Sequence, residues 1–111
     1  MILSIRNSDD FIGKFLRPIS KINNSYIFNI TSGGITTILA GADSTVILYA
    51  HYKKETKVSD DISLNIPDLT RLIKVLECIE SDNIELIIHS NHLEYKSADI
   101  RFKYHLLEPG I

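Results

Sequence analysis

The residues whose side chains could support catalysis or metal binding are four histidines and one cysteine. His89 and His92 are three residues apart, but a turn rather than a helix is expected between them, so they do not share a helix face. No cysteine or further carboxylate completes a zinc set at the usual spacing. We therefore interpret all the histidines as structural or surface residues: His51, His89, His92 and His105.

Other enzyme motifs are equally incomplete. Cys78 lies in no motif that marks a nucleophile. The pair Gly33-Gly34 lacks the strand-to-helix context and the lysine of a phosphate-binding loop, and Asp60-Asp61 is an isolated acidic pair in a predicted loop. We expect a protein that is not an enzyme, with no metal site and no cofactor. A small enzyme that uses His89 or His105 is the least favoured alternative.

The second pattern is basic and follows two predicted helices. On a helical wheel with 3.6 residues per turn, several lysines and arginines lie opposite the apolar side of each helix. They are Lys14, Arg17 and Lys21 on the first helix, and Arg71 and Lys74 on the second. Such side chains attract a polyanion without reading its sequence, but basic faces are also common on solvated helices. The faces alone favour the solvated reading, and Asp10 shares the face of Arg17.

The first helix has a clear start and an interrupted middle. Asn7 or Ser8 can cap its N-terminus, and Asp9 and Asp10 then occupy the first turn, where the helix dipole favours acids. Apolar residues recur at helical spacing as far as residue 22. Pro18 removes one backbone hydrogen bond, so we expect a kinked or loosened turn there.

The remaining elements follow from alternation and turn residues. A second helix runs from Pro67 and Asp68, in its first turn, to Ile79. Strands are predicted at Met1 to Arg6, Ser25 to Thr31, Ile35 to Ala40, Ser44 to Lys53, Ile62 to Ile66, Asn83 to His89, Leu93 to Lys96 and Asp99 to Leu106.

The element order is a strand, a helix and three strands, and then the same again. A shift of 61 residues places five apolar positions of the first half onto apolar positions of the second, from Leu3 on Leu64 to Phe15 on Leu76. We predict an α+β fold with a duplicated βαβββ unit and two helices packed on one side of antiparallel sheets. The repeats span about 1–58 and 59–107 of a single domain at 1–111.

The composition sets outer limits. A chain of 111 residues with 44% hydrophobic residues suits one domain with a proper core, and a net charge of −2 argues against a protein that is basic all over. A single cysteine suits a reducing compartment, and we find neither a signal peptide nor an apolar run long enough to cross a bilayer. We expect a soluble, intracellular protein.

Three segments resemble DNA sliding clamps of the proliferating cell nuclear antigen family. The run from Leu64 to Cys78 is similar to the family's helix segment, with its leucines, lysine and cysteine, and Asp82 to Leu86 continues the likeness. Ala42 to Val46 resembles an Asp-Ser turn and strand of the family, and Arg101 to Leu107 its last strand before the interdomain connector. The abundance of Ile, Asn and Lys is also similar to that of phage-encoded clamps.

The resemblance implies a function. Family clamps are rings of six such domains, with sheets outside and helices around double-stranded DNA. They act as non-catalytic processivity factors for a DNA polymerase and are placed on DNA by a clamp loader. The DNA-facing residues would be Lys14, Arg17, Lys21, Arg71 and Lys74, of which Lys74 matches a family lysine directly. At Glu77 the chain departs from the family pattern, in which a basic residue is common.

Several alternatives stay open from the sequence. Residues 108–111 would begin the connector, so the chain is either an N-terminal part of a longer clamp or a single-domain protein that assembles further. The family's partner groove lies beside that connector. The compartment would be the cytoplasm of a prokaryotic host for a phage protein and the nucleus for a eukaryotic one. The main alternative function is an α+β oligomerisation module that does not bind DNA.

Overall fold

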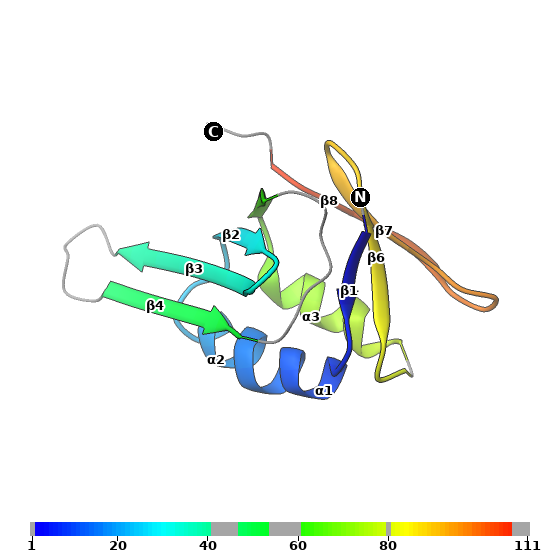
Figure 1. Ribbon diagram of the computed structural model, residues 1–111, viewed down its shortest axis with the longest axis horizontal. Helices are drawn as coiled ribbons and strands as arrows, with labels where there is room; N and C mark the ends of the chain where they lie inside the picture. The colour runs from blue at the N-terminus through cyan, green and yellow to red at the C-terminus, as the bar shows by residue number, and fades with distance from the viewer. Residues whose placement is uncertain (1, 41–46, 54–60, 80, 108–111) are drawn as a thin grey trace.

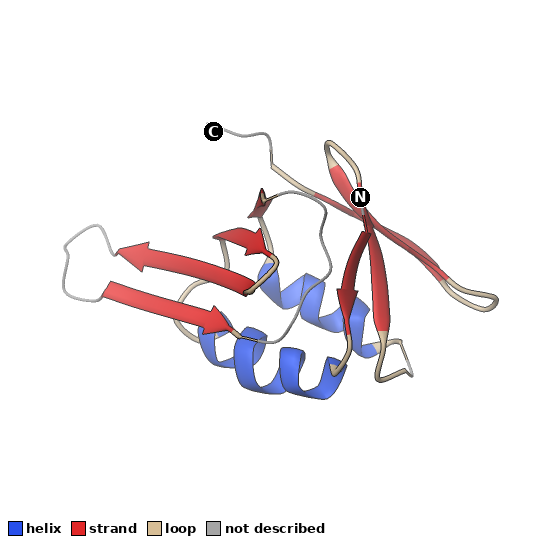
Figure 2. Ribbon diagram, in the orientation of Figure 1, coloured by secondary structure: helices blue, strands red, loops and turns tan. Residues whose placement is uncertain are grey.

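The computed structural model describes residues 2–40, 47–53, 61–79 and 81–107. Two four-stranded antiparallel sheets stand side by side, and the helices lie together on one side of them (Figures 1 and 2). The helical elements are α1 (Ser8–Asp10), η1 (Phe11–Leu16), α2 (Arg17–Ser20) and α3 (Leu69–Glu77). The strands are β1 (Ile2–Ile5), β2 (Tyr26–Thr31), β3 (Gly34–Ala40), β4 (Ile47–Tyr52), β5 (Ile62–Ile66), β6 (Ile84–Ile88), β7 (His92–Lys96) and β8 (Arg101–His105). The predicted fold class is confirmed.

The first helix is continuous through α1, η1 and α2, but its middle is π-helical. The backbone N–H of Arg17 donates to the carbonyl of Ile12, five residues back. Pro18 follows at once and has no N–H, so the α-helical bond to Lys14 cannot form. The wider π-helical turn accommodates this loss. The loosening predicted at Pro18 therefore takes the form of a π-helical segment rather than a break in the helix.

Each half of the chain places its first strand in the sheet of the other half. Strand β1 pairs with β6, so the two sheets have the orders β1-β6-β7-β8 and β4-β3-β2-β5. Strand β5 pairs with β2 in the same antiparallel way, with Leu64 opposite Phe28 and Ile66 opposite Tyr26. Neither half completes its sheet alone, and the duplicated βαβββ order thus forms one interlocked unit.

The core repeats with the sequence. The ten apolar residues related by the shift of 61 are all buried. They are Leu3 and Leu64, Ile5 and Ile66, Phe11 and Leu72, Ile12 and Ile73, and Phe15 and Leu76. Beyond the helices the shift becomes 58, and buried Tyr26, Phe28 and Ile30 of β2 correspond to buried Ile84, Leu86 and Ile88 of β6. The predicted boundaries near residue 58 and at 108–111 lie outside the described residues.

Each helix begins where the other ends. The N–H of Ser8 donates to the carbonyl of Asp82, beyond the end of α3, at 2.9 Å. The N–H of Leu69 donates to the carbonyl of Asn24, beyond the end of α2, at 2.8 Å. Ser8 and Leu69 are related by the shift of 61, and Asn24 and Asp82 by the shift of 58. These bonds satisfy N–H groups at the helix starts, which lack partners within their own helices.

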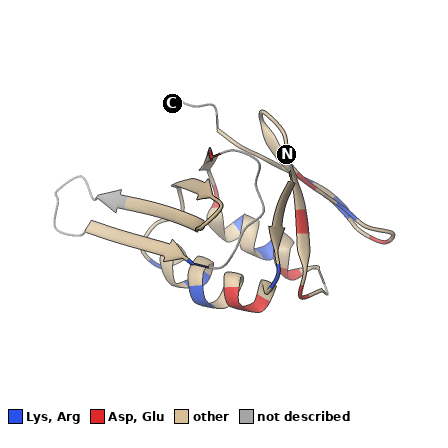
Figure 3. Cartoon of the chain, viewed as in Figure 1, with Lys and Arg blue, Asp and Glu red and all other residues tan. Residues whose placement is uncertain are grey.

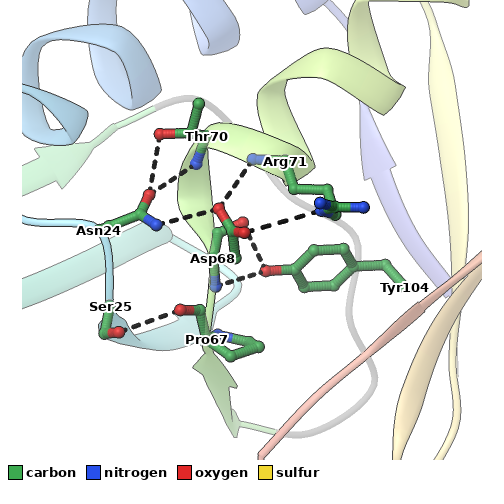
Figure 4. Close-up of polar contacts among 7 residues, drawn as sticks. All are labelled: Asn24, Ser25, Pro67, Asp68, Thr70, Arg71 and Tyr104. Atoms are coloured by element: carbon green, nitrogen blue, oxygen red, sulfur yellow. Dashed lines mark hydrogen bonds and ion pairs between the residues drawn. The ribbon is translucent and has the colours of Figure 1, made fainter.

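Several hydrogen bonds between side chains and backbone hold the junction at the start of α3 (Figure 4). The Asn24 side chain accepts from the backbone N–H and the hydroxyl of Thr70, and its Nδ2 donates to Oδ1 of Asp68 at 2.9 Å. Asp68 also accepts from the N–H of Arg71. The Asn24 and Arg71 bonds lower the pKa of the Asp68 carboxyl because they stabilise its charged form.

The junction corrects one sequence-based prediction. Pro67 and Asp68 were expected inside the first turn, but both precede α3, and Asp68 is its N-cap. The Pro67 carbonyl accepts from the Ser25 hydroxyl instead. The buried hydroxyl of Tyr104 accepts from the Asp68 N–H at 3.0 Å and donates to the Asp68 carbonyl at 2.8 Å. Burial raises the pKa of Tyr104 to about 12.

Tyr104 and Tyr52 provide a matched test of this junction. Each lies opposite a buried residue of the preceding strand, Leu93 and Ile35 respectively. Within the described residues, however, no group forms a hydrogen bond with the buried Tyr52 hydroxyl. We expect Tyr104→Phe to lower the free energy of unfolding by about 1–3 kcal/mol, because the partly buried Asp68 N–H loses its partner. Tyr52→Phe should be neutral or stabilising. Urea denaturation of both variants measures the difference, and equal losses would contradict this account.

Candidate nucleic-acid interface

The five basic residues singled out in the sequence are all exposed on the helices. Side-chain exposure is 81% for Lys14, 52% for Arg17 and 77% for Arg71. Lys21 and Lys74 are exposed as well. Basic and acidic positions are mixed on the helical ribbons, as Figure 3 shows. The outward orientation predicted by the helical wheel is therefore correct, and the surface is less purely basic than its lysines and arginines alone suggest.

Acidic side chains accompany three of the five cations. Lys14 pairs with Asp10, one turn earlier, at 3.2 Å, and Arg71 lies 3.7 Å from the carboxylate of Asp68. Arg17 pairs with Glu77. Exposed pairs of this kind contribute only about 0–1 kcal/mol, so a phosphate group can compete for the cations. Across residues 2–40, 47–53, 61–79 and 81–107, Lys21 and Lys74 form no ion pair.

The Arg17–Glu77 ion pair joins the two helices across 60 positions of sequence. Both side chains are about half exposed, so the outward faces of α2 and α3 adjoin at this point. Sequence reasoning placed each residue on its own helix face but could not pair them, since the pairing depends on how the helices pack. The two basic faces thus belong to one continuous helical surface.

A shallow groove of about 240 Å³ lies on the other side of the β4-β3-β2-β5 sheet, next to the last described residues. Ile27, Ile38 and Leu107 line it and are among the exposed large apolar residues. The N–H of Leu107 donates to the carbonyl of Asn65 at 3.1 Å, which ties the end of the described chain to β5. The predicted connector, residues 108–111, lies outside the described residues.

The histidines require a correction. The structure brings Glu94 to His89 and His92, so the expectation that no further carboxylate joins them is wrong. The sequence signal for Glu94 is strand alternation. His92 and Glu94 are two residues apart in β7 and therefore share a face of the strand. Burial and the nearby charge of His89 lower the pKa of His92. His51 lies on β4 and His105 on β8, opposite His92.

Cys78 is exposed just beyond α3, and its thiol donates to the Lys74 carbonyl. Gly33 lies in the turn before β3, Gly34 is the first residue of that strand, and Asp60 lies outside the described residues. In the part of the chain that the structure describes, we find no helix long and apolar enough to cross a membrane.

Comparisons with known proteins give a structural answer only. No protein-family model matches the chain, and a search of curated proteins also returns no match. Among solved structures, PCNA from Thermococcus kodakaraensis superposes with a TM-score of 0.77 over 100% of this chain, at 18% identity. A. fulgidus PCNA, bound to the C-terminal region of FEN-1, superposes with a TM-score of 0.77 over 98% of this chain, at 15% sequence identity. The beta subunit of DNA polymerase from Streptococcus pyogenes superposes with a TM-score of 0.73 over 96% of this chain, at 15% sequence identity.

This chain spans only part of each of those proteins. It covers 48% of the T. kodakaraensis chain, 46% of the A. fulgidus chain and 30% of the S. pyogenes chain. Identities of 15–18% establish a shared fold and leave activity and partners undetermined. The duplicated βαβββ unit, with its helices on one side of two sheets, has the fold of a sliding-clamp domain.

Proposed function

We propose that this chain is a domain of a DNA sliding clamp, a non-catalytic factor that encircles duplex DNA and holds a replicative polymerase on it. The observation that carries the proposal is the match of the whole chain to clamp domains from three proteins. The continuous surface formed by α2 and α3 supports it, because five exposed cations lie on the helices. In a ring built from such domains these helices would face the DNA.

The charge arrangement suits a protein that moves along DNA. Within the described residues Lys21 and Lys74 form no ion pair, so neither lysine would have to give up a partner to contact a phosphate. Among the described residues, Lys14 and Arg71 each pair with an acid one turn away, and a phosphate can replace such an exposed partner. No aromatic residue lies among the basic positions, and stacking platforms are typical of single-strand binders. Weak phosphate contacts would hold the duplex centred without stopping the protein.

Ring formation would use the free sheet edges. Strands β4 and β8 are edge strands, and edge strands offer unpaired backbone donors and acceptors to another chain. If β4 of one domain pairs with β8 of the next, the contact is head-to-tail, and a head-to-tail contact closes into a ring at a suitable rotation. We propose residues 1–111 as one domain of that ring, with 108–111 as the start of a connector.

Partners would dock at the apolar groove. A. fulgidus PCNA carries the C-terminal region of FEN-1, which shows that one protein of this fold accepts a peptide. In the present chain the groove beside Leu107 is the described apolar site nearest the proposed connector. A polymerase and a clamp loader are the partners that the proposed function requires.

A second candidate function also has a structural basis. The outer face of the β4-β3-β2-β5 sheet exposes Ile27, Ile38, Ile47 and Tyr49, each more than half exposed. A patch of this kind marks a contact surface for another protein. An oligomerisation module that does not bind DNA would use this patch and would leave the helix surface solvated.

Retention on closed DNA is the direct test. We expect the protein in its native oligomeric form, loaded onto circular plasmid, to stay bound through gel filtration and to be lost when the plasmid is linearised. The physical reason is that topology, rather than tight contact, holds a ring on DNA. Equal retention on circular and linear DNA would refute the clamp proposal, and no retention on either form would favour the oligomerisation module.

Charge reversal tests the helix surface. We expect the quadruple change of Lys14, Arg17, Lys21 and Lys74 to Glu to weaken duplex binding and flatten its salt dependence. Each lost phosphate contact should reduce the slope of log K against log salt by about 0.9. A control reverses three exposed residues of β7 and β8, away from the helices, and the loss is compared per reversed charge: Lys96, Arg101 and Lys103. If both variants lose binding equally, net charge rather than the helix surface controls the interaction.

Removal of the Glu77 charge tests the interhelix pair. Glu77→Gln should free the Arg17 guanidinium for phosphate, so duplex affinity should rise and the salt slope should steepen by about one contact. Glu85→Gln on β6 removes the same charge from an exposed strand position and serves as the control. Fluorescence anisotropy at several salt concentrations measures both. Unchanged binding with Glu77→Gln would place Arg17 outside the DNA contact.

A further inference from the structure

A compact group of imidazole and carboxylate side chains lies on the β1-β6-β7-β8 sheet. His89 and His92 flank a two-residue turn, which the N–H of His89 closes by donating to the carbonyl of His92 at 2.9 Å. Glu94 follows His92 by two positions on β7, and Leu93 between them is buried in the core. Strand alternation therefore points His92 and Glu94 away from the core, toward solvent.

The three side chains are close enough to share one ion. One ligand atom from each lies within 4.8 Å of the other two. Nε2 of His89 and Oε1 of Glu94 are 3.1 Å apart. In a tetrahedral zinc site with bonds of about 2.0–2.2 Å, ligand atoms lie roughly 3.3 Å from one another. The His89 and His92 rings stack with centroids 4.3 Å apart, so both side chains would rotate to turn their lone pairs toward one ion.

Neighbouring residues orient the potential ligands. Nδ1 of His92 lies 2.6 Å from Oδ1 of Asn91, and when this nitrogen donates to the amide oxygen, the lone pair of Nε2 is free for a metal. Arg101 contacts Oε2 of Glu94 at 3.2 Å, which leaves Oε1 on the side of His89. Such outer contacts fix ligand direction in known metal sites.

We propose that His89, His92 and Glu94 form a binding site for one divalent transition-metal ion of the zinc type. Two imidazoles and one carboxylate are ligands that zinc accepts, with a water molecule completing the tetrahedron. Calcium and magnesium prefer all-oxygen sites, so the imidazoles select against them. The imidazole of His105, opposite His92 on β8, lies 5.9 Å from that ring and borders the site.

A metal ion at this site would affect the β1-β6-β7-β8 sheet and not the helix surface. A bound ion would cross-link β7 to the end of β6 through the turn at residues 89–92. It would add stability to this hairpin, because a ligand that binds only the folded state shifts the unfolding equilibrium. It does not depend on DNA binding, so the site and the proposed clamp function can fail separately.

Zinc titration of the intact protein tests the site. The parent protein for this titration is the full chain with Cys78→Ser, and every variant is made from it, because an exposed thiol can itself bind zinc. With zinc sulfate at neutral pH we expect calorimetry to show one ion bound per chain. The midpoint temperature of thermal unfolding should rise. Cobalt chloride should give visible absorption bands of a site with nitrogen and oxygen ligands. His92→Ala and Glu94→Gln should each weaken binding at least about tenfold.

The control is His51→Ala, which removes an exposed histidine from β4 on the other sheet and should leave zinc affinity unchanged. Far-UV circular dichroism identifies any variant that fails to fold, and Glu94→Gln is nearly isosteric should His92→Ala unfold. No zinc binding by the parent protein would overturn the proposal. Binding that survives both ligand substitutions would also overturn it, since the ion would then occupy another place.

Discussion

The exchange of first strands between the two halves is the constraint on which the rest of the structure depends. Because β1 completes the sheet of β6 and β5 completes the sheet of β2, neither βαβββ unit can bury its apolar face alone. The same exchange brings both helices to one side, and reciprocal bonds from Ser8 and Leu69 fix where each begins. The continuous helix surface is a consequence of that arrangement.

The proposed metal site lies where the two halves differ. The shift of 58 relates His92, a proposed ligand, to Gly34 of the first half. Gly34 has a φ of 138°, and a Cβ there would meet the Tyr52 carbonyl oxygen at 1.9 Å, so no side chain fits. The first half therefore cannot carry a ligand at this position. The duplicated fold therefore permits the proposed metal site on the β1-β6-β7-β8 sheet, while the corresponding position of the β4-β3-β2-β5 sheet is a glycine.

Features set by local sequence were predictable, and features set by packing were not. Alternation in β2 and β6 and helical spacing in α3 were enough to predict these three elements. The role of Asp68 as N-cap was missed because an acid suits both a cap and a first turn, and Asn24, 44 residues away, helps to hold it. The Arg17–Glu77 pair had no local signal, since it forms only when the helices meet.

The acids on the helix surface are consistent with weak binding rather than opposed to it. A chain with net charge −2 has five of its 12 lysines and arginines on the helix surface, beside carboxylates such as Asp10 and Glu77. In the proposed clamp, a phosphate contact of Arg17 would replace an existing ion pair, so its net gain would be smaller than the gross attraction. Lys21 and Lys74 lack such a competitor within the described residues and would supply most of the residual attraction. In the proposed clamp, partial neutralisation would limit the affinity at each phosphate, and a ring held by topology would need no more than that to stay centred while it slides.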